Sequence, residues 1–359
     1  MRLALDEAKR GLGRTSPNPV VGAVIVRDDR VVAKGFHRKA GAAHAEIEAL
    51  KNLGSDLLGA TMYVTLEPCS HTGLTPPCCK AIAQTGIRRV VVGMQDPNPL
   101  VNGQGIAYLR EQGLEVRSAV LEQECRAINR PFIKFVQTSL PYMVMKAGVS
   151  LDGRLNYTGH TPGKITGDES WREVHRLRDR YDAIMVGSGT ILSDDPALTT
   201  RLFGRQGRDP VRLILDSHLR IPDIAKVYNL DSPAISIVFC KKGLDSARRE
   251  KLAGLGVEVC EVAEKDAGLD LIEVMQKIAQ QGILSVLVEG GSRLHGSLLR
   301  RQLYDYAHLF YAPVFAGDCG QPLAHGLSVS GAVSAPRLFQ PIYKQLGEDM
   351  LVEGLVLYP

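Results

Sequence analysis

A histidine, a glutamate and two cysteines stand in an order that predicts a metal centre with a catalytic acid/base. His44 and Glu46 are two residues apart, and Cys69 and Cys78 follow, each directly after a proline. One imidazole and two thiolates suit tetrahedral Zn²⁺ with a fourth position for water, whose pKa the metal lowers from about 15.7 to roughly 7. Glu46 is then placed to carry a proton from that water to a departing amine. The set predicts hydrolytic deamination of a base-like ring.

Each part of this set also has a simpler interpretation. A lone His-x-Glu is usually an exposed helix pair, and two cysteines in a reducing compartment are more often buried thiols than ligands. Cys79 adjoins Cys78 and could compete for the metal. A disulfide is disfavoured, because the first 13 residues carry charges where a secretory signal needs an apolar core. The ordered combination favours zinc.

The elements around these residues are expected to bring them together. Residues 44–53 have the pattern of a helix, and His44 and Glu46 lie in its first turn. Residues 60–66 predict a strand that leads to Cys69, and another helix is expected to open at Cys78. Two helix starts and one strand end would then converge on one metal.

The first half of the chain alternates helices and strands. The expected elements are a helix near 2–11, strands at 20–26, 31–36 and 88–94, a helix at 105–113, a strand at 114–121 and a helix at about 122–138. This pattern predicts an α/β fold with a five-stranded mixed sheet and helices on both faces.

A domain boundary is expected before Pro141, which gives domains of 1–139 and 140–359. The expected elements of the second half are helices at 168–180, 245–254, 270–281 and 292–303, and strands at 142–150, 182–187, 211–217, 234–240, 257–262 and 285–291, then β segments. An ordinary Rossmann site is not supported, because no Gly-x-Gly-x-x-Gly stands in a strand-to-helix turn. Residues 288–292 are the nearest phosphate-loop candidate, although a double glycine after a strand is usually just a tight turn.

Size and composition agree with two globular domains. A chain of 359 residues is too long for one typical domain. Apolar content is 45% and no uncharged stretch has membrane length. The net charge of +4 favours neither nucleic acid nor a membrane surface as a partner. Seven cysteines, without a secretory signal, suit a cytoplasmic enzyme.

Longer motifs resemble a known family. LEPCSHTGLTPPC at 66–78, with SPNPVVG at 16–22 and QDPNPLVNGQG at 95–105, resembles the deaminase half of the bifunctional riboflavin-biosynthesis enzymes. The eight residues between the cysteines distinguish it from the Pro-Cys-x-x-Cys of cytidine deaminases. Residues 146–155, 174–201, 214–217 and 288–291 resemble successive signatures of the reductase half. The resemblance implies a cytidine-deaminase-like first domain and a second α/β domain that resembles dihydrofolate reductase.

The resemblance also implies cofactors and roles. Zn²⁺ and NADPH are the expected cofactors, a phosphoribosyl-pyrimidine is the expected substrate, and a homo-oligomer is expected. In the first domain zinc is assigned to His44, Cys69 and Cys78, proton transfer to Glu46, and substrate contacts to Asn18, His37 and His71. In the second domain catalysis is assigned to Lys146 and Glu289, and substrate binding to Arg178, Leu198, Arg201 and Glu289. NADPH binding is assigned to Gly148, Lys164, Thr190, Asp194, Ser217, Gly291, Ser292 and Arg293. Taken singly, Arg178 and Arg201 would more often be surface charges.

Two positions depart from the family pattern. Leu74 stands where a basic or polar residue is usual, which removes one possible phosphate contact. Lys164 replaces a tryptophan that many relatives carry, so an aromatic wall for the nicotinamide is expected to be missing unless the lysine instead contacts cofactor phosphates. Alternatives to the two-step enzyme are a deaminase with a silent reductase domain as oligomerisation scaffold, and a non-catalytic zinc-stabilised nucleotide-binding module.

Overall fold

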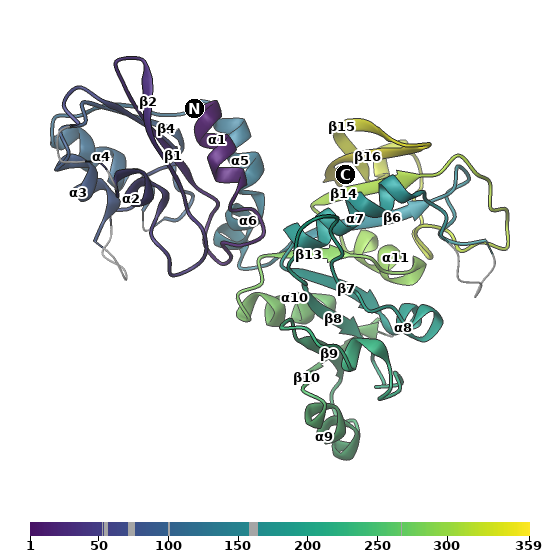
Figure 1. The fold of residues 1–359 in the computed structure, drawn as a ribbon. Helices are drawn as coiled ribbons and strands as arrows, with labels where there is room; N and C mark the ends of the chain where they lie inside the picture. Colours follow the sequence, from purple (N-terminus) through teal and green to yellow (C-terminus); the bar gives the residue numbers. More distant parts are fainter. Residues whose placement is uncertain (52, 54–56, 71–75, 100, 158–163, 267) are drawn as a thin grey trace. The chain divides into compact units, whose positions relative to one another are not determined.

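The chain divides into two compact units, Met1–Leu140 and Pro141–Pro359 (Figure 1). A computed structural model describes residues 1–51, 53, 57–70, 76–99, 101–157, 164–266 and 268–359. His71 and Leu74, singled out from the sequence, lie outside the described residues. Each unit is built around its own sheet, and the division falls one residue after the boundary expected from the sequence.

The first unit contains the predicted five-stranded mixed sheet. Its strands are β1 (Gly22–Arg27), β2 (Arg30–Phe36), β3 (Thr61–Leu66), β4 (Arg89–Met94) and β5 (Glu115–Arg117), in the order β2-β1-β3-β4-β5. The β1 strand is antiparallel to β2 and β3, whereas β3, β4 and β5 are parallel. Strand β5 is shorter than the sequence suggested, because it lies at the edge and pairs only with β4.

Helices cover both faces of this sheet, as predicted. They are α1 (Arg2–Lys9), α2 (Ala45–Leu50), α3 (Cys78–Ala83), α4 (Gln104–Glu111), α5 (Glu122–Ile128) and α6 (Arg130–Thr138). Two glycines allow helices α1 and α2 to pack closely on the sheet. A Cβ on Gly22 would lie 2.1 Å from the carbonyl oxygen of Ala4 in α1, and a Cβ on Gly35 would lie 2.4 Å from the carbonyl oxygen of Ala45 in α2. Ala23 pairs with Gly35, so α1 and α2 pack on opposite faces of the sheet.

The single helix expected over 122–138 is wrong. The chain forms α5 and α6 instead, with Asn129 between them. The Asn129 side chain accepts a hydrogen bond from Val20 N–H at 2.7 Å and donates one to the Val20 carbonyl at 2.9 Å. Pro131, in the first turn of α6, suits a helix start. A contact with Val20, 109 residues away in the sequence, therefore interrupts the apolar pattern.

The second unit is built on a nine-stranded sheet. Its strands are β6 (Tyr142–Val149), β7 (Ala183–Gly187), β8 (Val211–Leu215), β9 (Ser236–Lys241), β10 (Glu258–Val262), β13 (Ser285–Val288), β14 (Tyr306–Tyr311), β15 (Arg337–Leu346) and β16 (Asp349–Leu357). The order is β10-β9-β8-β7-β13-β6-β14-β16-β15. Neighbours from β10 to β14 are parallel, and β15 and β16 add an antiparallel edge. The pair β11 (Glu264–Lys265) and β12 (Gly268–Leu269) is separate.

Five α-helices are described in this unit: α7 (Asp168–Arg180), α8 (Ser188–Asp194), α9 (Ser246–Gly254), α10 (Leu271–Gln280) and α11 (Ser292–Arg300). Short 3-10 turns lie at Lys226–Tyr228 and Ala332–Ser334. The sequence did not indicate α8, which is rich in serine, glycine and aspartate but packs Ile191 into the core. Within the described parts of the chain, no helix is long and apolar enough to cross a membrane.

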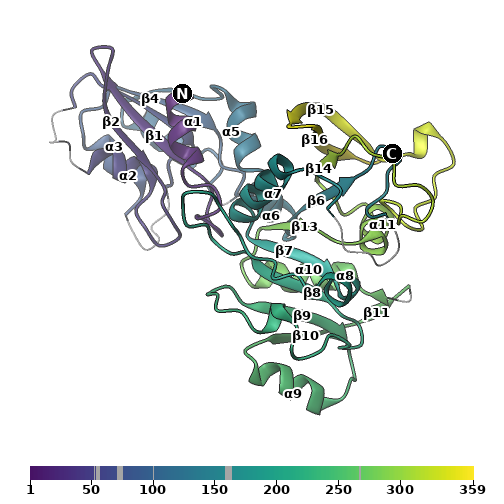
Figure 2. The same cartoon turned by 45° about the vertical axis from the view of Figure 1, so that its right-hand side comes forward.

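The order of the parallel strands predicts where this unit binds ligands. From β7 the chain continues through α8 to β8 on one side, whereas from β13 it continues through α11 to β14 on the other (Figures 1 and 2). The carboxyl ends of β7 and β13 therefore border a topological switch point, where open α/β sheets bind ligands. Gly187 and Glu289 lie at this edge of the sheet.

Candidate active sites

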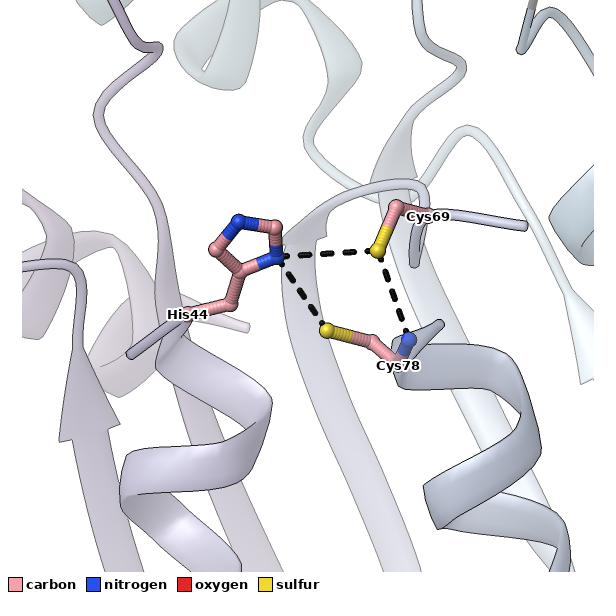
Figure 3. A group of neighbouring side chains, drawn as sticks. All are labelled: His44, Cys69 and Cys78. Carbon is pink, nitrogen blue, oxygen red and sulfur yellow. Dashed lines mark hydrogen bonds between the residues drawn. The ribbon is translucent and has the colours of Figure 1, made fainter. Parts of the chain in front are cut away.

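Three ligand atoms converge in the first unit, on the side chains of His44, Cys69 and Cys78 (Figure 3). His44 Nδ1 lies 3.2 Å from Cys78 Sγ and 3.6 Å from Cys69 Sγ, and all three atoms lie within 4.8 Å of one another. Zinc bound at the usual 2.0–2.1 Å to nitrogen and 2.3 Å to sulfur places these atoms about 3.6 Å apart. The donor set and its spacing therefore fit zinc with one coordination position left for water.

Each member of this cluster is held at the end of an element. His44 is the N-cap of α2, Cys78 is the first residue of α3, and Cys69 follows β3. The Cys78 N–H donates to Cys69 Sγ at 3.3 Å, which turns the start of α3 toward the sulfur. Cys79 packs in the hydrophobic core instead, so the structure brings Cys78 and not Cys79 to the cluster.

The polar contacts of the cluster favour a thiolate. The hydrogen bond from the Cys78 thiol, with His44 beside it, lowers the pKa of Cys69 to about 4. The hydrogen bond to Cys69, together with burial, raises the pKa of Cys78. The hydrogen bond between His44 and Cys69 raises the pKa of His44. Cysteine binds metals as the thiolate. A divalent cation would compensate the negative charge of two adjacent thiolates.

Glu46 is buried beside this cluster. Its side chain is 3% exposed and lies within hydrogen-bonding reach of the Cys78 sulfur. Burial raises the pKa of Glu46 to about 7. A carboxyl group in this position can exchange protons near neutrality, which is what an acid/base group requires.

Asn18 and His37 lie next to the cluster. The His37 and His44 rings are 5.7 Å apart and perpendicular. His37 Nδ1–H donates to the Ala43 carbonyl at 3.0 Å, so its Nε2 accepts from Asn18 Nδ2 at 3.1 Å. Burial lowers the pKa of His37, which keeps the ring neutral. The predicted pair is therefore pre-oriented to form hydrogen bonds with a ring edge.

The second unit holds a cavity of about 1350 Å³ at the carboxyl ends of its parallel strands. Twelve of the residues predicted for the reductase line it: Lys146, Gly148, Lys164, Arg178, Thr190, Asp194, Leu198, Ser217, Glu289, Gly291, Ser292 and Arg293. Arg201 is not among the described lining residues, but its guanidinium lies 5.8 Å from the ring of Trp171, which lines the cavity.

An ion-paired triad of Lys146, Arg178 and Glu289 lines this cavity. Arg178 donates from Nε and a terminal nitrogen to the two Glu289 oxygens at 2.7 and 2.9 Å, and Lys146 Nζ lies 3.4 Å from the second oxygen. Burial by itself raises the pKa of Glu289, but the charges of Arg178 and then Lys146 lower it to about 2. Glu289 is thus a carboxylate at any physiological pH.

The loop after β13 fits a phosphate. Gly291 is the N-cap of the nine-residue helix α11, and a Cβ there would meet only Thr190 Oγ1 at 3.9 Å. Ser292 is 4% exposed, and its buried hydroxyl has no hydrogen-bond partner among the described residues. Open space before a helix start and an unpaired hydroxyl suit the pyrophosphate of a dinucleotide cofactor.

Trp171 and His175 lie on the cavity side of α7, one turn apart, and the sequence had given neither a role. Their rings are 4.1 Å apart, and Lys164 Nζ lies 5.0 Å from the indole centroid. An aromatic group therefore stands beside Lys164, where the sequence suggested that one was missing. The helical spacing of 171, 175 and 178 could have indicated this common face.

Comparisons with known proteins cover both units. Residues 141–352 match the model of the RibD C-terminal domain, and residues 1–94 match that of the cytidine and deoxycytidylate deaminase zinc-binding region. The riboflavin biosynthesis protein RibD of Bacillus amyloliquefaciens is 39% identical over 356 residues, which span 99% of this chain and 95% of the relative. This chain belongs to the RibD family.

Solved structures agree over the whole length. RibD of Acinetobacter baumannii has a TM-score of 0.88 and 34% identity, covering 99% of this chain and 97% of that one. The diaminohydroxyphosphoribosylaminopyrimidine deaminase/5-amino-6-(5-phosphoribosylamino)uracil reductase of Thermotoga maritima has a TM-score of 0.86 and 36% identity, covering 100% and 97%. Family membership makes the chain a deaminase and reductase of riboflavin biosynthesis, with zinc and NADPH as cofactors, and confirms the expected cytidine-deaminase-like and dihydrofolate-reductase-like folds.

Proposed function

We propose that the first unit deaminates 2,5-diamino-6-ribosylamino-4(3H)-pyrimidinone 5′-phosphate, and that the second unit then reduces the ribosyl group to ribityl with NADPH. The observation that carries this proposal is the convergence of His44, Cys69 and Cys78 within 4.8 Å, with Glu46 buried beside them. The Thermotoga maritima relative, whose name states this pair of activities, supports the choice of substrate.

In the deamination, water adds to the amine-bearing ring carbon, the carbon–nitrogen bond breaks, and ammonia leaves. Zinc, when bound by the cluster, would lower the pKa of water into the neutral range. Glu46 takes a proton from the water and delivers it to the departing nitrogen. Asn18 and His37, which hydrogen-bond to each other, orient the ring edge, and we retain His71 as a third substrate contact.

In the reduction, NADPH supplies a hydride to C1′ of the C=N bond of the ring-opened ribosylamine, and the nitrogen of that bond takes a proton. Glu289 is ionised and therefore does not donate this proton. We assign this proton to Lys146, whose Nζ lies 3.4 Å from Glu289. Arg178, with Leu198 and Arg201, is assigned to the substrate. The residues after β13, with Gly148, Lys164, Thr190, Asp194 and Ser217, are assigned to the cofactor.

One coupled assay tests both steps. Purified protein with zinc, NADPH and the proposed substrate should release ammonia and then oxidise NADPH in equal amounts. Ammonia release without NADPH oxidation would support the silent-reductase alternative instead. If neither reaction occurred, although zinc and NADPH bound, the proposed substrate would be wrong.

We further propose that the chain forms a homo-oligomer through edge strand β15. Phe339, Ile342 and Tyr343 on this strand are 46, 50 and 64% exposed. An exposed apolar edge strand is a surface that another chain can cover, and a second copy presents the same strand. Light scattering should show a species larger than the monomer, and Tyr343→Glu should reduce it to the monomer. A monomeric unaltered protein would refute this.

A cytoplasmic location is also proposed. All seven cysteines are free in the structure, and two of them belong to the zinc cluster. Free thiols persist in a reducing compartment, whereas an oxidising one would put the ligand cysteines at risk of disulfide formation. Fractionation of cells that express the protein would test this.

A further inference from the structure

Glu67, between β3 and Cys69, accepts four backbone hydrogen bonds. The side chain is 3% exposed. Its Oε2 accepts from Asp96 N–H at 3.2 Å and Gly103 N–H at 2.9 Å. Its Oε1 accepts from Gly105 N–H at 2.9 Å and Ile106 N–H at 3.2 Å. A buried carboxylate that accepts four backbone N–H groups is held in place, because moving it would leave donors unpaired in the interior.

The four donors lie in two places. Asp96 and Gly103 bind the same oxygen, so the two ends of segment 96–103 meet at one atom. Gly105 and Ile106 belong to the first turn of α4, whose N-cap Gly103 has no side chain to cap the helix. Glu67 therefore caps α4 from a position 38 residues earlier.

The same contact reaches the segment that carries Cys69. A Cβ on Gly105 would lie 2.0 Å from the Pro68 carbonyl oxygen and 3.3 Å from Glu67 Oε1. The start of α4 therefore packs directly on the peptide that precedes Cys69. On its other side the Cys69 carbonyl accepts the Cys79 N–H at 3.2 Å. The position of Cys69 is thus set by α4 through Glu67 and Pro68, and by α3.

We propose that Glu67 is a positioning residue of the deaminase, which holds the Cys69 sulfur at the place that zinc requires. This inference rests on the proposed ligand set. No role for Glu67 followed from the sequence, although it precedes Pro68-Cys69 directly. Groups that orient metal ligands change metal affinity by about 10- to 100-fold when they are altered, without touching the metal themselves.

Glu67→Gln is the first test. The carbonyl oxygen of the glutamine can accept from only one of the two pairs of N–H donors, while its NH₂ group, itself a donor, faces the other pair. Zinc affinity, measured by competition with a chelator, should fall by about tenfold or more. The visible spectrum of the cobalt-substituted protein, which reports thiolate geometry at the metal, should change. Glu111→Gln, an exposed glutamate at the end of α4, is the matched control and should change neither.

Gly105→Ala is an independent test. It keeps the Glu67 carboxylate but disturbs the close packing of residue 105 on the Pro68 carbonyl. It should alter the cobalt spectrum in the same direction as Glu67→Gln. If Glu67→Gln does not fold, Gly105→Ala alone tests the positioning role. Both variants should bind NADPH like the unaltered protein, since the cavity belongs to the second unit.

Wild-type zinc affinity and an unchanged cobalt spectrum in both folded variants would overturn the positioning role, even if their thermal stability fell. Failure of the unaltered protein to bind zinc or cobalt would be a different result. It would overturn the ligand set of the proposed function, and with it the premise of this inference.

Discussion

Replacing Glu289 with glutamine should destabilise the second unit, because it removes the anion that compensates two largely buried cations. Burial opposes ionisation of Glu289, yet Arg178 and Lys146 lower its pKa from the ordinary 4.5 to about 2. That difference corresponds to about 3 kcal/mol of stabilisation at neutral pH. The side chains of Glu289, Arg178 and Lys146 are only 9, 13 and 18% exposed, so solvent screens the triad weakly. We expect Glu289→Gln to cost about 3 kcal/mol.

Trp171 provides the assay, because it is the only tryptophan of the chain and lies in the second unit. Thermal unfolding of the full-length protein, followed by tryptophan fluorescence, reports this unit alone. A loss of about 3 kcal/mol should lower its thermal midpoint by roughly 6–12 °C. Glu264→Gln is the matched control, since Glu264 is 49% exposed and its ion pair with Lys241 should contribute less than about 1 kcal/mol.

The pH dependence has a definite sign. A carboxylate with a lowered pKa stabilises the fold above the pKa of the unfolded chain, about 4.5, and this contribution is lost as the pH falls toward 2. The stability difference between the unaltered protein and Glu289→Gln should therefore shrink to less than half between pH 7 and pH 3. A difference below about 0.5 kcal/mol at pH 7, or one that does not shrink, would refute this account of the triad.

Three further predictions concern the two sites. Glu46→Gln should retain zinc and NADPH oxidation with deaminated substrate but slow ammonia release by about a hundredfold or more; near-normal release would remove its role as proton carrier. Elemental analysis should show that Cys78→Ala loses zinc and that Cys79→Ala keeps it. The reverse outcome would make Cys79, not Cys78, the zinc ligand. Gly291→Val should fold normally, because the nearest described atom to a Cβ there is Thr190 Oγ1 at 3.9 Å, yet weaken NADPH binding in a fluorescence titration. Unchanged NADPH affinity would exclude this loop as the phosphate site.

The sequence was most informative where pattern and chemistry act locally. Order and residue type were enough to group His44, Cys69 and Cys78, because the helix starts and strand end that carry them follow from short patterns. The alternating elements likewise predicted the five-stranded sheet. In both cases the decisive information lies within a few residues of the feature.

The sequence was least informative where distant residues meet. Asn129 interrupts a helical pattern through bonds to Val20, and α8 exists because Ile191 reaches the core. Glu67 gave no signal, since its four partners lie about 30 to 40 residues further along the chain. The placement of Trp171 beside Lys164 also depends on how α7 packs, which no local pattern specifies.

The closure of segment 96–103 on a single oxygen makes it a natural site for loop exchange. Both ends of the segment are fixed at Glu67 Oε2, and between them Val101 is buried whereas Asn102 is exposed. The entropic cost of a longer loop between fixed ends grows only slowly, by about 0.6 kcal/mol per doubling of its length. Insertions beside exposed Asn102, with Val101 kept in its buried position, should therefore leave the anchors on Glu67 and the metal cluster unchanged.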